Sequence, residues 1–549
     1  MKRPGRAFVA VVGAFWLLLA GTASANSILV PISGAGSTWV SNALDQWIRN
    51  IAQDGVQVNY AATGSSDGRN EFRNGTVDFG ASEIPYGLHD AFTGSDPLPP
   101  RPFAYIPDVA GGTTFMYNLH FGGHQIRNLR LDGKTLAEIF TGVIREWNNP
   151  QIKQDNPNLQ LPAERIVPVV RSDGSGTTAQ FTLWMSHMHP AVWNAYCAKF
   201  GIKAPCGLTS VYPVVPGSDM IALSGSLGVA GYVAQSTSEG AITYVEYSYT
   251  LETGYPAVAL ENTAGYYTLP TANNVAVSLL KAQINYDAKS TAYLTQNLSN
   301  VYSDPDPRTY EMSSYSYMII PTSTEDGFST DKGYTLGKFV YYMLCQGQQE
   351  APILGYSPLP INLAEAGFAQ VRKIPGVDVE SINVRGCDNP TFSTSGKNTL
   401  AVDAPYPPAC AKAGPTQCSA TQMSANMVTT KTRVPTTTTI PKKAAVTTTT
   451  PVPRKTGGRN TRMTAVLAST TAVLGSTTTV PLPSWALTTT TTVPGSTTTV
   501  PIAAESVIVG NDLSAGSDLP YGLASLVVLG AIVVGPPLLS RALHKRGRR

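Results

Sequence analysis

The segment that most restricts the fold is a loop of glycines and hydroxyls between a strand-like run and a helix-like run. The strand-like run is 166–170, the loop is 171–178 (Arg-Ser-Asp-Gly-Ser-Gly-Thr-Thr), and the helix-like run is 179–185. Glycine lets the backbone approach a ligand closely, and the first N–H groups of a helix have no partner inside it. Arg171 adds a planar fork suited to a phosphate or carboxylate. The segment predicts an oxyanion cradle, although a polar turn with an ordinary helix cap is an open alternative.

The same order of strand, small polar loop and helix recurs near the N-terminus. An apolar run and a glycine-rich loop at 28–38 precede an amphipathic stretch at 39–51. Similar passages from strand to loop follow at 56–68 and 77–83. Strands alternating with helices predict an α/β fold with a mostly parallel sheet. Ligands of such sheets gather at the carboxyl ends of the strands, where these loops lie.

Both ends of the chain predict export and attachment to a membrane. Residues 1–25 have a basic start, an apolar centre and a small-residue cleavage site, so they predict a signal peptide. Residues 519–540 carry no charge and precede a basic tail at 541–549, which predicts a transmembrane helix with a cytoplasmic C-terminus. A buried core helix is the alternative for this segment. The Thr/Pro-rich tract at 419–518 predicts an extended stalk, or an ordinary disordered linker.

The composition limits the partners and the redox environment. The 549 residues carry a net charge of +3, which does not suggest a nucleic-acid-binding surface. An even number of cysteines in an exported chain favours three disulfides among 15 possible pairings. Pairing of nearest neighbours is our preferred arrangement, with the last pair in a cysteine-containing tail at 401–418. The pairs are Cys197 with Cys206, Cys345 with Cys387, and Cys410 with Cys418.

The remaining motifs favour a binding protein without a cofactor over an enzyme. Gly174-Ser175-Gly176 lacks the glycine spacing of a nucleophile elbow, and no cysteine has the spacing of a zinc site. His187 and His189 form a candidate metal pair, but no third ligand is near them in the sequence. We therefore expect neither a metal nor catalytic residues.

Several segments, taken together and in order, resemble the phosphate-binding proteins of bacterial ABC importers. The strongest single match is 171–178, and the resemblance covers roughly residues 28–370. The other matching segments are 34–38, 58–68, 77–82, 131–140 with Trp147, 240–246 and 355–360.

The resemblance implies the type II fold of periplasmic binding proteins, in which two α/β lobes close on a ligand by hinge motion. Lobe I would be discontinuous, built from 26–112 and 255–400, and lobe II would span 113–254. The ligand would be inorganic phosphate, delivered to the permease subunits of an ABC importer. We expect a monomer in the cell envelope, and the helix predicted at 519–540 would hold it at the outer face of the cytoplasmic membrane.

The resemblance also implies a set of phosphate-binding residues. Asp173 would orient Arg171 without touching the anion. The residues that would contact phosphate are Thr38, Trp39, Ser65, Glu83, Arg171, Ser175, Gly176 and Thr177.

Glu83 is the main departure from the family pattern, which has an aspartate at this position. That carboxylate accepts the proton that phosphate keeps at neutral pH and sulfate lacks, so it sets the selectivity. Glutamate keeps the charge but is one methylene longer. A surface adhesin or a sensor that uses the same scaffold without transport is therefore the alternative function.

Overall fold

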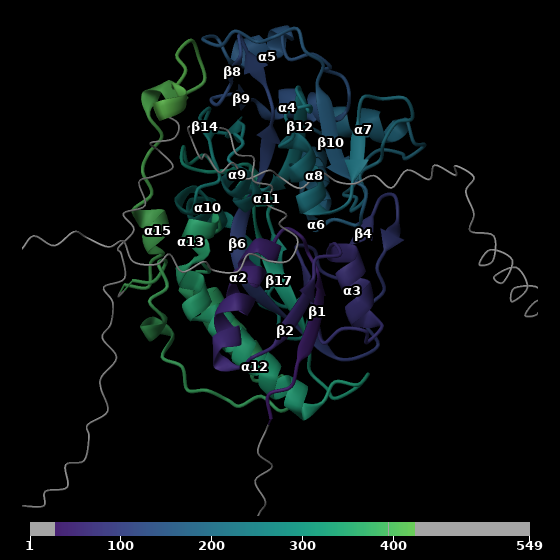
Figure 1. Ribbon diagram of the computed structural model, residues 1–549, viewed down its shortest axis with the longest axis vertical. Coiled ribbons are helices and arrows are strands. Elements are labelled where there is room, and N and C mark those ends of the chain that lie inside the picture. The colour runs from purple at the N-terminus through teal and green to yellow at the C-terminus, as the bar shows by residue number, and fades with distance from the viewer. Residues whose placement is uncertain (1–27, 394, 423–549) are drawn as a thin grey trace, which may run out of the picture. The chain divides into compact units, whose positions relative to one another are not determined.

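One sheet runs through the whole part of the chain that the structure describes (Figure 1). The computed structural model describes residues 28–393 and 395–422. The sheet has eight strands in the order β11-β10-β12-β6-β17-β3-β1-β2. Along the chain, strands alternate with helices as the sequence predicts, so the α/β class is confirmed.

The sheet is mixed, which corrects the expectation of a mostly parallel one. β1, β2 and β3 form one parallel group, and β10, β11 and β12 form another. The long strands β6 and β17 lie between the groups and pair antiparallel with each other and with their neighbours. The strand patterning of a sequence carries no information about strand direction, so the mixed pairing could not be predicted from it.

The strands and helices have the following bounds. The main sheet contains β1 (Ile32–Gly36), β2 (Val58–Ala61), β3 (Phe79–Ser82), β6 (Phe103–Tyr117), β10 (Val167–Arg171), β11 (Ile221–Leu223), β12 (Ala241–Glu246) and β17 (Ser313–Pro321). The small sheets contain β4 (His89–Asp90), β5 (Gly94–Ser95), β7 (His120–Phe121), β8 (His124–Gln125), β9 (Arg130–Leu131), β13 (Ala259–Glu261), β14 (Tyr267–Thr268), β15 (Gln283–Ile284) and β16 (Gln296–Asn297). The α-helices are α2 (Ser41–Ile51), α3 (Ser65–Arg73), α4 (Gly133–Phe140), α5 (Pro150–Asp155), α6 (Gly176–Met188), α7 (Pro190–Ala198), α8 (Gly225–Val233), α9 (Tyr247–Thr253), α10 (Ala272–Ser278), α11 (Ser299–Tyr302), α12 (Thr330–Leu344), α13 (Ala351–Leu354), α14 (Ile361–Val371) and α15 (Thr399–Val402).

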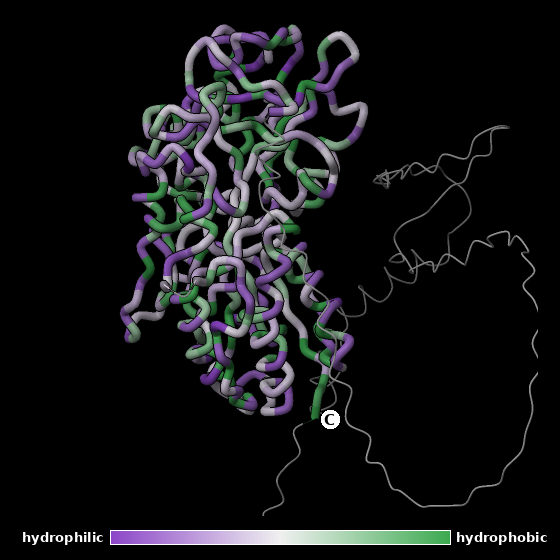
Figure 2. The backbone as a smooth tube through the Cα atoms, turned by 90° about the vertical axis from the view of Figure 1, so that its left-hand side faces the viewer, coloured by the Kyte–Doolittle hydropathy of each residue, from purple (hydrophilic) through white to green (hydrophobic). Residues whose placement is uncertain are grey.

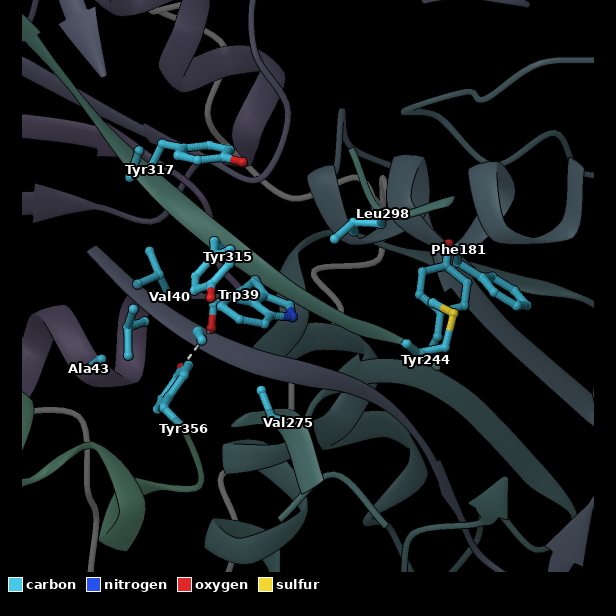
Figure 3. Close-up of a cluster of buried hydrophobic side chains, with 14 of the residues drawn as sticks. Trp39, Val40, Ala43, Phe181, Tyr244, Val275, Leu298, Tyr315, Tyr317 and Tyr356 are labelled. Atoms are coloured by element: carbon cyan, nitrogen blue, oxygen red, sulfur yellow. Dashed lines mark hydrogen bonds between the residues drawn. The ribbon is translucent and has the colours of Figure 1, made fainter. Parts of the chain in front are cut away.

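The two parallel groups occupy opposite ends of the described unit, with β6 passing between them. In Figure 1, β1, β2, α3 and α12 lie toward one end, whereas α4, α5, α7 and β10 lie toward the other. The central core joins both groups through large aromatic side chains. Trp39 and Tyr315 lie together in Figure 3, and Phe181 and Tyr244 lie beyond them toward the second group.

Helix α2 shows how the sequence specifies this core. Its apolar residues recur at helical spacing, and Ala43, Leu44, Trp47 and Ile51 are all buried. The residue before it, Val40, is buried as well. The amphipathic stretch predicted at 39–51 therefore folds as a helix whose apolar face covers the sheet.

The three disulfides join the cysteine pairs predicted from nearest neighbours in the sequence. The bonds are Cys197–Cys206, Cys345–Cys387 and Cys410–Cys418. The last one closes a tail that folds back on the rest of the chain, since the Arg130 side chain donates hydrogen bonds to the Cys410, Gly414 and Thr416 carbonyls.

The pairing of β13 with β9 brings 259–261 beside 130–131. The lobe boundaries that the resemblance implies stay a prediction.

Several predicted segments lie outside the described residues. They are the signal peptide at 1–25, nearly all of the stalk at 419–518, the transmembrane helix at 519–540 and the basic tail at 541–549. Within 28–393 and 395–422, none of the helices has the length and apolar character needed to cross a membrane. Accordingly, short hydrophobic and hydrophilic stretches alternate along the described tube in Figure 2.

The disulfides should differ in their contribution to stability because they close loops of different length. Cys345 and Cys387 are 42 residues apart, and Cys197 and Cys206 are nine apart. We expect Cys345→Ala/Cys387→Ala to lower the free energy of unfolding by about 4 kcal/mol and Cys197→Ala/Cys206→Ala by about 2.5 kcal/mol. All four cysteines are buried, so the second pair is a matched control in urea titrations. Equal losses would show that loop closure does not set the difference.

Candidate functional site

Loops from the two parallel strand groups touch each other at the carboxyl ends of their strands. From the first group come the loop after β1, the start of α3 and the residue after β3. From the second come the loop between β10 and α6 and the start of α8. The Ser66 N–H donates to the Gly174 carbonyl at 2.9 Å, directly joining the two sides. The sheet therefore assembles one site from segments that are far apart in the sequence.

Glu83 is the buried acceptor at the centre of this site. Its side chain is 1% exposed, so its carboxylate depends on protein donors. The Ser65 hydroxyl donates to Oε2 at 2.7 Å, the Ser316 hydroxyl donates to Oε1 at 3.2 Å, and the Ser37 hydroxyl also donates to Oε1. Three serines from three different segments therefore hold one carboxylate.

Ser65 connects Glu83 to the opposite loop. Its Oγ accepts a hydrogen bond from the Gly176 N–H at 3.0 Å while its own proton goes to Glu83. Gly176 is the first residue of α6, so this N–H is one of the donors that a helix leaves without an internal partner. A Cβ on Gly176 would lie 2.1 Å from Glu83 Oε2. Glycine is required here because the backbone comes this close to the carboxylate.

Arg171 faces the site from the end of β10 and is fixed by Asp173. Its Nε donates to Asp173 Oδ1 at 2.7 Å, and Nη2 forms an ion pair with Oδ2. Burial raises the pKa of Asp173, but the hydrogen bonds and the charge of Arg171 outweigh it and hold that pKa below its usual value. Asp173 is therefore ionised at neutral pH, and it also accepts the Gly225 N–H at 2.9 Å. That Asp173 supports Arg171 in phosphate binding, as the resemblance implies, stays a prediction.

The Ser226 side chain joins Arg171 to the loop after β1. The Ser226 hydroxyl lies 2.7 Å from Thr38 Oγ1 and accepts from Arg171 Nη1 at 3.2 Å. The Ser226 N–H donates to the same Thr38 oxygen at 3.2 Å. Thr38 and Arg171, which come from different strand groups, thus meet through one buried side chain.

The remaining predicted residues lie around the same contact. Ser175 Oγ accepts from the Thr178 N–H at 3.1 Å and caps α6, and Thr177 is buried in the first turn of that helix. The Trp39 N–H donates to Ser37 Oγ at 3.0 Å, and the Trp39 indole donates to Thr113 on β6 at 3.2 Å. Tyr356 donates to the Trp39 carbonyl, as drawn in Figure 3. Trp39 therefore anchors its loop to a strand that joins the two groups.

Sequence reasoning missed three serines of the site. Ser37 lies inside the matched segment 34–38 and was available as a hydroxyl there. Ser226 follows β11 in Ser-Gly-Ser, which repeats the pattern of strand, small polar loop and helix, and that pattern could have found it. Ser316 lies within a strand, where no local signal distinguishes it from other strand serines.

The two candidate metal-binding histidines do not share a site. The His189 ring packs against Trp184, whereas the His187 ring packs against Tyr302. Among the residues that the structure describes, no group of three or more histidine, cysteine or acidic side chains is arranged to hold a metal ion. The described groups that meet at the site are hydrogen-bond donors, the Glu83 carboxylate and the Arg171–Asp173 ion pair.

The close contact between the loop before α6 and Glu83 should depend on the absence of a Cβ at Gly176. We expect Gly176→Ala to lower the free energy of unfolding by about 1–3 kcal/mol, because the new Cβ would force Glu83 and the α6 loop apart. Gly231 in α8 is the matched control, since a Cβ there meets nothing within 4 Å. We expect Gly231→Ala to leave stability unchanged or raise it by up to about 1 kcal/mol in urea titrations. Equal behaviour of the two variants would contradict the close approach.

Comparisons with known proteins agree on one family. A family model described as a PBP superfamily domain matches residues 20–346. The phosphate-binding protein PstS of Xylella fastidiosa strain Temecula1 is 32% identical over 337 residues, which cover 61% of this chain and 83% of the relative. PstS of Haemophilus influenzae is 29% identical over 355 residues, covering 64% and 94%.

A solved phosphate-binding protein from Stenotrophomonas maltophilia aligns at 16% identity with a TM-score of 0.44, over 67% of this chain and 99% of that one. The relatives are named as binding proteins, not as enzymes. The family model and the PstS relatives confirm the family that the sequence resembles. The chain belongs to the PBP superfamily and, within it, to the family of the PstS phosphate-binding proteins.

Proposed function

We propose that this protein binds inorganic phosphate outside the cytoplasm and delivers it to a phosphate ABC importer. The observation that carries the proposal is the Glu83 site, where hydroxyls and one helix N–H from both strand groups surround a single buried carboxylate. Apart from Asp173, which is already paired with Arg171, Glu83 is the one acidic acceptor among the predicted site residues. This is the arrangement that an oxyanion with one remaining proton needs.

The donors that now join the two loops are the ones that would turn to phosphate. The Gly176 N–H, Ser65 and Thr38 form hydrogen bonds between the loops that a bound oxyanion can replace one for one. Ser175, Thr177 and the Trp39 N–H complete the set that the family resemblance implies. Arg171 supplies the only positive charge in the set, and Asp173 already pairs with it. Affinity would therefore come from oriented dipoles and not from a net positive charge.

Glu83 would decide which oxyanion is accepted. Phosphate keeps a proton at neutral pH and can donate it to the carboxylate, but sulfate has none and would be repelled by it. The longer side chain of glutamate fits the site because Ser37, Ser65 and Ser316 together hold both carboxylate oxygens. We infer that the change from aspartate preserves selectivity for phosphate.

The signal peptide predicted at 1–25, the transmembrane helix predicted at 519–540 and the disulfides all favour a location outside the cytoplasm. Three disulfides suit an oxidising compartment outside the cytoplasm, in agreement with the signal peptide predicted at 1–25. The proposed helix at 519–540 would hold the protein at the outer face of the membrane, and the stalk would keep it near the importer. Closure of two lobes by a hinge at β6 and β17 is the motion that we propose.

Calorimetric titration with phosphate and sulfate tests this function. We expect the protein to bind phosphate and to give no heat with sulfate at pH 7.5. Glu83→Gln should reduce the preference for phosphate over sulfate by about 10–100-fold. The carboxylate can only accept a hydrogen bond, whereas the glutamine amide can also donate one to sulfate.

Two variants serve as controls. Glu325→Gln changes the same group at an exposed position and should bind like the original protein. Arg171→Ala should lose most phosphate affinity, because Thr38, Ser226 and Asp173 would lose the group that joins them. No heat from the unmodified protein with either anion would reject the proposal and favour the adhesin or sensor alternative.

A further inference from the structure

The segment that follows Glu83 leaves the first strand group and contacts the second. Residues 84–96 include the hairpin of β4 and β5, in which Asp90 lies opposite Gly94. In Figure 1 the hairpin, labelled at β4, lies beside α6 and next to α3. Its contacts with the second strand group are additional to those that surround the Glu83 carboxylate.

A buried arginine of α3 holds both ends of this segment. Arg69 is 2% exposed, and its fork of donors reaches two different acceptors. Its Nη1 donates to Ser82 Oγ at 2.8 Å, and its Nε donates to Asp96 Oδ2 at 2.8 Å. The Tyr86 hydroxyl donates to the Arg69 carbonyl at 2.5 Å. The segment is therefore fixed at its start and at its end to the first strand group.

Asp90, at the turn of the hairpin, binds the second strand group. It is 6% exposed, and its Oδ2 accepts the N–H and the hydroxyl of Ser210 at 2.6 and 2.8 Å. Its Oδ1 accepts the Phe92 and Thr93 N–H groups at 2.9 and 3.0 Å, which shapes the turn. Burial raises the pKa of Asp90, but these hydrogen bonds outweigh it and hold that pKa below its usual value. The two bonds to Ser210 therefore have a charged acceptor, which strengthens them.

Backbone and apolar contacts surround the bonds between Asp90 and Ser210. The Ala91 N–H donates to the Leu208 carbonyl at 2.8 Å. The rings of Phe92 and Phe200 meet edge to face, with their centroids 5.8 Å apart. Ile84 packs with Leu208 and with α6 in one buried cluster. The segment thus combines polar and apolar contacts with the second strand group.

The loop that receives Asp90 is bonded directly to the predicted phosphate-binding residues. The Ser210 carbonyl accepts the Ser175 N–H at 2.8 Å, and Ser175 caps α6. At the start of the segment, the Glu83 carbonyl accepts a hydrogen bond from Gln180 Nε2 at 2.9 Å. A rigid-body movement that separates the two strand groups would therefore break the contacts of the segment together with those of the site.

We propose that residues 84–96 form a latch that keeps the two strand groups closed over the Glu83 site, with Asp90 as the positioning residue that engages Ser210. The inference rests on the proposed phosphate function and adds a determinant of how long the ligand is held. Phosphate enclosed by both groups leaves only when they separate, so loss of the contact between Asp90 and Ser210 makes its release faster. Association requires the open form and is not slowed.

Stopped-flow tryptophan fluorescence of the full chain tests the effect on phosphate release. Ser210→Ala removes one hydroxyl of the contact and leaves the turn bonds of Asp90 intact, so it should raise the release rate constant by about 3–10-fold. Asp90→Ala removes the charged acceptor and should raise it by about 10–100-fold. The association rate constant should fall by no more than about twofold in either variant.

Spin labels follow the separation of the strand groups without phosphate. Asn74→Cys at the end of α3 and Lys153→Cys in α5 place one exposed thiol on each group. These thiols are the only free ones, because all six native cysteines form disulfides. The distance between the labels should lengthen in Ser210→Ala and in Asp90→Ala. A defect confined to the packing of the hairpin would lower stability in urea and leave this distance unchanged.

Asp287→Ala is the matched control. Asp287 is exposed and accepts the Lys289 N–H at 3.0 Å in the turn of the hairpin of β15 and β16. Its loss should leave phosphate release and the label distance unchanged. The double variant Asp90→Ala/Ser210→Ala should release phosphate no faster than Asp90→Ala, because the shared contact is already gone. Effects that multiply in the double variant would show two independent defects and overturn the latch.

The two readouts separate the latch from the function on which it rests. If the unmodified protein binds no phosphate but the labels move apart in Ser210→Ala and Asp90→Ala, the proposed function fails and the latch stands. If the unmodified protein binds phosphate, and both variants match it in release rate and label distance, the latch fails and the function stands.

Discussion

The burial of Glu83 is the constraint on which the rest of the site depends. A buried carboxyl group needs hydrogen-bond partners from the protein, and Glu83, which is 1% exposed, receives them from Ser37, Ser65 and Ser316. These serines belong to the loop after β1, to the start of α3 and to β17. Satisfying one charge therefore fixes three separate segments relative to each other. The second strand group joins them through the Gly176 N–H on Ser65.

The mixed sheet explains how distant segments can meet at one carboxylate. Two parallel groups direct the carboxyl ends of their strands toward each other, and β6 and β17 pass between the groups. Trp39 links the first loop to Thr113 on β6, and Ser316 on β17 reaches Glu83 itself. The strands best placed to transmit relative motion of the two groups thus also contact the site. Binding and closure would then be coupled through ordinary hydrogen bonds.

Local sequence patterns predicted much of the fold and the loops that meet near Glu83. Strand, small polar loop and helix is a local signal, so the loops at 34–38, 64–68 and 171–178 could be recognised along with Thr38, Ser65 and Arg171. The disulfides followed from proximity in the sequence. Strand direction did not follow, because β6 and β17 are defined by pairing across the sheet. Ser316 was missed for the same reason: its contact with Glu83 depends on how strands more than 200 residues apart in the sequence pair in the sheet.

A crystal structure of the protein with phosphate is the most direct measurement of whether Glu83 reads the ligand proton. We expect phosphate between Arg171 and the start of α6, with one of its oxygens about 2.5–2.7 Å from a Glu83 carboxylate oxygen, as for a hydroxyl that donates to a carboxylate. The Gly176 N–H and the Ser65 hydroxyl should have turned from each other to the phosphate. Phosphate bound elsewhere, or bound here with Glu83 turned away and still held only by serines, would contradict this role for Glu83.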